Sequence, residues 1–169
     1  DYDLAILRFS KAMIINGNNK KYYNNQAVCF MVQTFIKNQS NPHIESLLLT
    51  ANHKNSRTLL SLFNLISFHR FISPDQNKFL ELADTLINYV TNEGNKLPGF
   101  YGDELYFYVE TAENYLLHSQ IFRLEMDALM MSFPERDKCY QDKVRKAILW
   151  RTTEYKGDCY AQTGERERS

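Results

Sequence analysis

The stretch that decides the fold is residues 103–133, DELYFYVETAENYLLHSQIFRLEMDALMMSF, where apolar side chains recur every third or fourth residue. Alternating steps of three and four place such side chains along one side of an α-helix. Asp103 can cap the start, and neither Gly nor Pro interrupts the pattern before Pro134. The stripe comprises Tyr101, Leu105, Tyr108, Ala112, Tyr115, Ser119, Phe122, Met126, Leu129 and Phe133. We therefore predict one long central helix over residues 103–132.

A helix of roughly 30 residues is about 45 Å long, which is enough to span a small domain. Other helices must then lie along it to cover its apolar side. The same spacing also suits a coiled coil, which is the alternative. The stripe is wide and aromatic and lacks regular charge pairs on its flanks, and this favours a core helix over a coiled coil.

Apolar spacing and local start signals predict six further helices. Ser56 can cap one of them and Asn41 another, while Ser73 and Gln76 have the spacing of a capping box. The region 57–71 is apolar on nearly every side, which indicates a buried helix. The predicted ranges are 2–15, 22–37, 42–51, 57–71, 74–92 and 134–155.

These elements predict an all-α fold of about seven helices with short connections and no strand. The layout is similar to a stack of helical pairs, as in armadillo or HEAT solenoids, or to an irregular bundle around the central helix. No internal repeat is present, which weakens the solenoid interpretation. We expect a single all-α domain over 1–156 and a mobile polar tail over 157–169. Because residue 1 is Asp rather than Met, we also expect the chain to belong to a larger protein.

Composition limits the classes of function. The 169 residues are 44% hydrophobic with a formal net charge of zero, which suits a folded domain and argues against a polyanion binder that uses its whole surface. Three cysteines without a CxxC spacing predict a reducing compartment, and hence an intracellular (cytoplasmic or nuclear) location. No apolar run approaches 18 residues, so we expect no membrane partner.

The chain lacks the short motifs that carry chemistry. It contains no HExxH, no phosphate-cradling GxGxxG or GxxxxGK[ST], and no GxSxG. On the long helix His118 would lie about 140° from Glu113, so both could not serve one inward metal site. A Cys–His pair could still meet in space. We expect a protein that is not an enzyme, with no catalytic residue, metal ligand or cofactor.

Two kinds of binding remain. Eleven phenylalanines and eleven tyrosines favour a protein-interaction or self-association module, and the predicted anchors are Phe107, Ile121, Met131, Tyr140 and Trp150. The alternative is an RNA- or DNA-binding domain that uses the basic helix 134–156. Its candidate residues are Lys20, Lys21, Lys138, Lys143, Arg145, Lys146 and Arg151. Zero net charge and the absence of a nucleic-acid motif favour the protein partner.

Overall fold

The computed structural model describes residues 1–53, 56–92, 97, 104–107 and 134–163, and in the last helix the side chains of residues 145, 146 and 148–161. These residues form six α-helices and one π-helical turn, with no strand among them, and this confirms the all-α prediction. The helices are α1 (Tyr2–Ile15), α2 (Lys21–Lys37), α3 (Ile44–Ala51), α4 (Leu59–Ser67), the π-helix η1 (Phe68–Ile72), α5 (Gln76–Thr91) and α7 (Pro134–Thr163).

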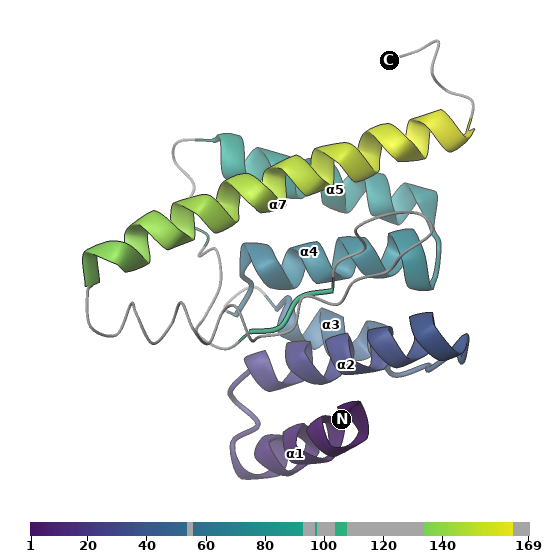
Figure 1. Cartoon of the computed structure of the whole chain (residues 1–169), viewed down its shortest axis with the longest axis vertical. Helices are drawn as coiled ribbons and strands as arrows, with labels where there is room; N and C mark the ends of the chain where they lie inside the picture. The colour runs from purple at the N-terminus through teal and green to yellow at the C-terminus, as the bar shows by residue number, and fades with distance from the viewer. Residues whose placement is uncertain (54–55, 93–96, 98–103, 108–133, 164–169) are drawn as a thin grey trace.

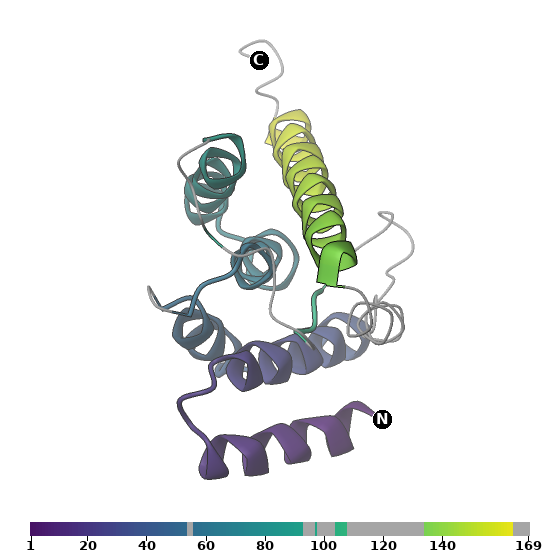
Figure 2. The same cartoon turned by 90° about the vertical axis from the view of Figure 1, so that its left-hand side faces the viewer.

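The described helices follow one another along the long axis of the molecule in chain order (Figure 1). Each of them packs against the next, and α4 also touches α7. One end of the molecule is formed by α1, and the other by α5 and α7, as the perpendicular view also shows (Figure 2). As a result, α1 has a neighbouring helix on one side and lies at the end of the stack on the other.

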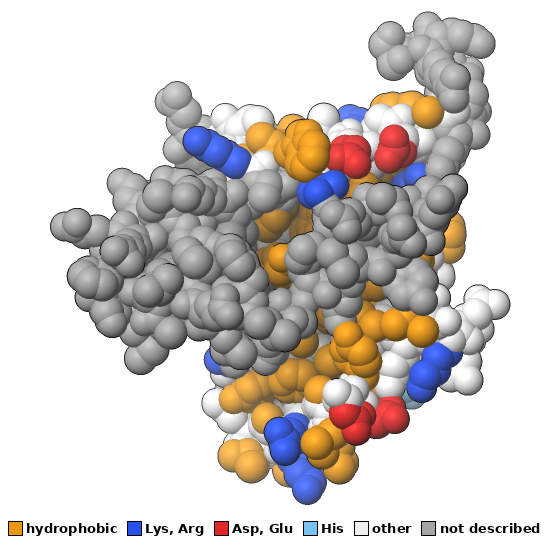
Figure 3. Space-filling model, in the orientation of Figure 1, with side chains coloured by type: hydrophobic (Ala, Val, Ile, Leu, Met, Phe, Trp, Pro, Cys, Tyr) orange, Lys and Arg blue, Asp and Glu red, His pale blue; other side chains and the backbone are white. Residues whose placement is uncertain are grey.

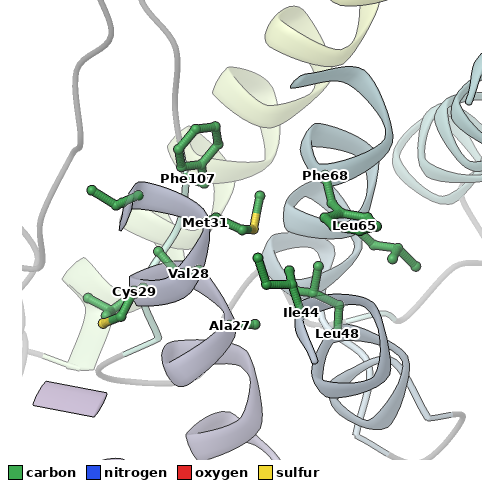
Figure 4. Packing of buried hydrophobic residues seen from close by; sticks show 11 residues of the cluster. Ala27, Val28, Cys29, Met31, Ile44, Leu48, Leu65, Phe68 and Phe107 are labelled. Atoms are coloured by element: carbon green, nitrogen blue, oxygen red, sulfur yellow. The ribbon is translucent and has the colours of Figure 1, made fainter. Parts of the chain in front are cut away.

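Helix α4 lies at the centre of the packing. All nine of its residues are buried, as the apolar sequence of this region predicts. One hydrophobic cluster joins α2, α3 and the π-helix through residues such as Met31, Ile44 and Phe68 (Figure 4). A second cluster joins α4, α5 and α7 through Leu62, Phe79 and other residues. Because α4 contributes to both clusters, it ties the two ends of the stack together.

Several helices begin at other residues than the sequence predicted. The cap of α4 is Thr58, whose side chain accepts the N–H of Ser61, and the predicted cap Ser56 lies two residues too early. Asp75 caps α5 and accepts the N–H of Lys78, whereas Ser73 closes the π-helix by donating its own N–H to Phe68 O. An N-cap must immediately precede the first helical residue, and the π-helical turn moves that position from Ser73 to Asp75.

The predicted central helix does not begin at residue 103. Residues 104–107 are not helical, and they form an elongated stretch between α2 and α4 (Figure 1). The rest of that prediction, 108–132, lies outside the described residues. The last helix also differs, because α7 continues to Thr163 instead of ending near residue 155. Tyr155 and Cys159 of α7 are buried in the second cluster, so packing against α4 and α5 extends the helix into the predicted tail.

Candidate functional site

Three fully buried asparagines lie where α2 and α4 face each other. Asn24 and Asn25 belong to α2, and Asn64 belongs to α4. Burying an amide side chain is costly unless its donors and acceptor find partners. The hydrogen-bond partners of the three side chains therefore indicate their structural role.

Their partners are backbone atoms of the non-helical segment Glu104–Phe107. The N–H of Leu105 donates to Asn25 Oδ1 at 2.8 Å. Leu105 O accepts from Asn24 Nδ2 and from Asn64 Nδ2, both at 3.0 Å. The N–H of Phe107 donates to Asn64 Oδ1 at 2.8 Å. Side-chain amides thus take the place of the partners that a helix or a sheet would supply to this backbone.

The same amides are bonded to one another. Asn64 Nδ2 donates to Asn24 Oδ1 at 2.8 Å, and Asn24 Nδ2 donates to Asn25 Oδ1 at 3.2 Å. These two bonds fix the orientation of each amide and therefore the positions of the groups offered to the segment. We call the surface formed by Asn24, Asn25 and Asn64 the amide groove.

The segment's first residue is held at the start of α4. Glu104 is buried, and its Oε2 accepts from Thr58 Oγ1 at 3.0 Å. The same hydroxyl oxygen accepts the N–H of Ser61 at 3.0 Å, so the cap of α4 and the carboxylate share one side chain. A carboxylate at this place is also favoured by the positive end of the helix dipole.

The next three side chains alternate between the two hydrophobic clusters. Leu105 and Phe107 belong to the first cluster (Figure 4). The Phe107 ring lies edge-on to Phe35 with centroids 5.5 Å apart. Tyr106 packs against the second cluster. Such alternation is typical of an elongated chain. Phe107, one of the predicted protein anchors, is 3% exposed and anchors the segment in the core.

The other predicted protein anchors differ in exposure and in whether the structure describes their side chains. Trp150 lies on α7 and is 60% exposed, with the guanidinium of Arg151 4.4 Å from its ring centroid. Tyr140 belongs to α7, but its side chain lies outside the described residues. Ile121 and Met131 also lie outside the described residues. Trp150 is therefore the predicted anchor that the described structure leaves available to a partner.

Most of the predicted nucleic-acid residues with described side chains have contacts within the chain. Lys20 donates to Gly17 O at 3.3 Å, and the ammonium of Lys21 lies 5.8 Å from the ring centroid of Tyr22. Arg145 donates to Leu97 O, and Arg151 pairs with Glu154 at 3.5 Å. Lys146 is exposed, whereas the side chains of Lys138 and Lys143 lie outside the described residues. These contacts within the chain engage cationic groups that would have to bind the phosphates of a nucleic acid.

Helix α1 has an apolar face that its neighbours leave uncovered. Ala5, Ile6 and Phe9 pack on the first cluster, but no residue of α1 is buried. The opposite side carries Leu4, Leu7, Ile14 and Ile15 within an arc of about 100°, and we call these four residues the α1 outer face. Ile14 and Ile15 are 85% and 86% exposed. Five of the eight large apolar side chains that are exposed in the described residues lie on α1.

The space-filling view places apolar side chains at the end of the molecule that α1 forms (Figure 3). The sequence contains a signal for this surface, because apolar residues occupy both sides of the predicted helix 2–15. A helix that is apolar on two sides needs two neighbours, and the end position of α1 in the stack supplies mainly one, α2.

Two findings among the described residues concern metal binding and thiol reactivity. Among them no group of three or more His, Cys, Asp or Glu side chains is placed to hold a metal ion. Burial raises the pKa of the Cys29 thiol to about 12, which keeps it protonated and unreactive near neutral pH. No helix in the described part of the chain is both long and apolar enough to cross a membrane.

Comparisons with protein-family models, with curated proteins and with solved structures found no match to this chain.

Proposed function

We propose that this protein is a non-catalytic helical interaction module that binds an apolar helix of another protein, or of a second copy of itself, through the α1 outer face. The observation that carries the proposal is the exposure of Ile14 and Ile15, at 85% and 86%, next to Leu4 and Leu7 on the same side of α1. Apolar side chains exposed together on one side of a helix are typical of interaction sites.

The position of α1 explains why a partner would be stabilised there. Its inner side already packs on α2, so a second helix on the outer side would continue the stack by one layer. Burying a fully exposed Ile or Leu side chain contributes about 1.5–3 kcal/mol of transfer free energy. Leu4 and Leu7 are 44% and 52% exposed, so each would contribute about half of that. Four such residues are enough to form the centre of a modest interface, with polar residues around them.

The face also has a polar feature that would select among partners. Lys11 is exposed and lies between Leu7 and Ile14 on the same side of the helix. Its aliphatic stem can lie along the apolar surface while the ammonium reaches an acidic group at the edge. The partner of best fit is therefore an amphipathic helix with an Asp or Glu beside its apolar stripe.

Trp150 supports binding at a second place, on α7. Tryptophan and arginine are enriched among residues that dominate interface energies. Trp150 is exposed, and the guanidinium of the half-buried Arg151 lies 4.4 Å from its ring centroid. The nucleic-acid alternative has weaker support, because Arg145 and Arg151 already have partners within the chain.

The test compares the native chain with the double variant Leu7→Gln/Ile14→Gln by sedimentation velocity over a range of concentrations. Glutamine is a good helix former and carries no charge, so it removes apolar area and leaves the helix in place. Leu49→Gln is the matched control, because Leu49 is 54% exposed on α3, away from the α1 outer face. We expect self-association that the double variant weakens at least about tenfold and the control leaves unchanged.

A different protein as partner would be detected by placing a photo-crosslinking residue at position 14, with position 49 as the control. A chain that stays monomeric and shows no excess of crosslinks at position 14 would refute the proposal. RNA affinity that falls steeply with salt and is lost on Lys146→Glu would support the nucleic-acid alternative instead.

A further inference from the structure

The amide groove has the properties of a binding site whose ligand is part of the same chain. The segment Glu104–Phe107 is held through its backbone by three side chains that come from helices about 40 and 80 residues earlier in the sequence. We propose that the amide groove is a binding site for a short peptide, that Glu104–Phe107 occupies it in cis, and that it accepts a partner peptide with the pattern Glu-Leu-aromatic-Phe. This proposal shares no residue with the α1 outer face and stands independently of it.

The groove is organised by contacts among its own residues. The bonds from Asn64 to Asn24 and from Asn24 to Asn25 involve no atom of the segment. They aim Asn25 Oδ1, Asn64 Oδ1 and two amide N–H groups at the place where Leu105 and Phe107 lie. A site whose polar groups are already oriented loses little entropy when a ligand arrives. Hydrogen bonds to N–H and C=O groups recognise any peptide backbone, so the groove itself selects for a peptide.

The side chains of the segment define which peptide fits. A carboxylate at the first position reaches Thr58 Oγ1 at the start of α4. Leucine at the second position and phenylalanine at the fourth enter the first cluster, where Phe107 meets Phe35. An aromatic residue at the third position packs against the second cluster. The ligand is therefore an acidic and aromatic peptide, which differs from the amphipathic helix expected at the α1 outer face.

The covalent connection makes the cis segment an internal competitor. A tethered ligand has an effective concentration that is typically in the millimolar range for a short connection. A partner peptide therefore binds well only when the hold on the cis segment is weakened, and the segment acts as an autoinhibitory contact. Leu105→Ala weakens that hold without removing the backbone N–H and C=O that the amides recognise.

The test uses the full chain labelled with nitrogen-15 and the probe acetyl-Glu-Leu-Tyr-Phe-amide. Side-chain amide signals of Asn24, Asn25 and Asn64 report on the groove directly. We expect the probe to shift these three signals saturably in the Leu105→Ala variant, and to bind it at least about tenfold more tightly than the native chain. Leu49→Ala is the matched control, because Leu49 is exposed on α3, and it should bind the probe as weakly as the native chain does.

A second probe separates backbone recognition from apolar adhesion. It carries the same side chains but has N-methyl groups on its leucine and phenylalanine. These groups replace the two N–H donors whose hydrogen bonds Asn25 Oδ1 and Asn64 Oδ1 accept. We expect its affinity for the Leu105→Ala variant to be lower by at least about tenfold. Equal affinity of the two probes, or a folded variant whose amide signals do not respond, would overturn the proposal. If Leu105→Ala does not fold, Phe107→Leu loosens the segment more gently and is measured with the same two probes.

Discussion

The backbone N–H of Phe107 donates to Asn64 Oδ1 at 2.8 Å, across 43 residues of sequence. The same amide donates from Nδ2 to Leu105 O at 3.0 Å, so one side chain of α4 pairs with backbone groups of two residues in the segment. In a helix those groups would find partners four residues away along the chain. Asn64 replaces these local bonds with long-range ones, and so the backbone of a non-helical segment is hydrogen-bonded in the core.

Asn64→Ala should therefore destabilise the fold strongly. The change leaves the Phe107 N–H without its acceptor and removes a donor from Leu105 O and from Asn24 Oδ1. An unsatisfied buried polar group costs about 1–3 kcal/mol, so we expect a loss of roughly 2–5 kcal/mol in the free energy of unfolding. Chemical denaturation measures it, with the exposed Asn18→Ala as a control that should change stability by less than about 0.5 kcal/mol. Equal effects of the two variants would contradict the role of Asn64.

Phe107 and Trp150 should respond in opposite ways to truncation. Phe107 is 3% exposed, and Phe107→Ala should lower the free energy of unfolding by about 3–5 kcal/mol through lost burial and a cavity. Trp150 is 60% exposed, and Trp150→Ala should change it by less than about 1 kcal/mol, mainly through the contact with Arg151. Denaturation midpoints of the two variants compare them directly. A larger loss at Trp150 would mean that α7 is packed differently.

The contrast between these two aromatics shows how far a sequence can predict a site. Both lie in predicted helices with apolar spacing, and nothing local distinguishes them. Phe107 is buried because Asn24, Asn25 and Asn64 satisfy the backbone around it, and this requires residues 43 or more positions away to come together. The period of three and four residues through Leu105 was compatible with a helix, but tertiary hydrogen bonds overrode it.

The start of α5 provides a local test. Asp75 accepts the N–H of Lys78 at 3.1 Å, so Asp75→Ala should lose about 1 kcal/mol of stability, through the cap and its favourable charge at the helix start. Ser73→Ala should have a much smaller effect, because its side chain caps no helix and its backbone bond to Phe68 O survives the change. Thermal or chemical unfolding distinguishes them. A larger effect at Ser73 would restore the start that the sequence alone predicted.

The six predicted helices other than 103–132 are present among the described residues, and their boundaries were less predictable than their existence. The ranges 2–15 and 22–37 agree with α1 and α2 to within one residue, because Asn-rich turns end both helices. The π-helical turn at Phe68–Ile72 has no local signal of that kind, and it displaced the start of α5. The apolar residues of α1 were visible as well, but which of its sides is covered depends on its end position in the stack.

That π-helical turn carries a buried histidine that should make stability depend on pH. Burial lowers the pKa of His69 below its usual 6.5, and the nearby Lys78 ammonium acts in the same direction. Glu45, whose Oε1 lies 3.8 Å from Nε2, acts against both but does not reverse the shift. In the folded chain the neutral imidazole is therefore favoured.

The sign of the effect follows from proton binding. Between pH 6.5 and the lower pKa of the folded state, the unfolded chain holds more protons at this position than the folded chain. The free energy of unfolding should therefore fall as the pH drops below 6.5, with a slope of at most about 1.4 kcal/mol per pH unit from this group. His69→Gln removes the titration and should flatten that part of the profile, whereas the exposed His53→Gln should leave its slope in place. Denaturation of the three chains between about pH 5 and about pH 7.5 measures the difference, and equal slopes for the native chain and His69→Gln would refute it.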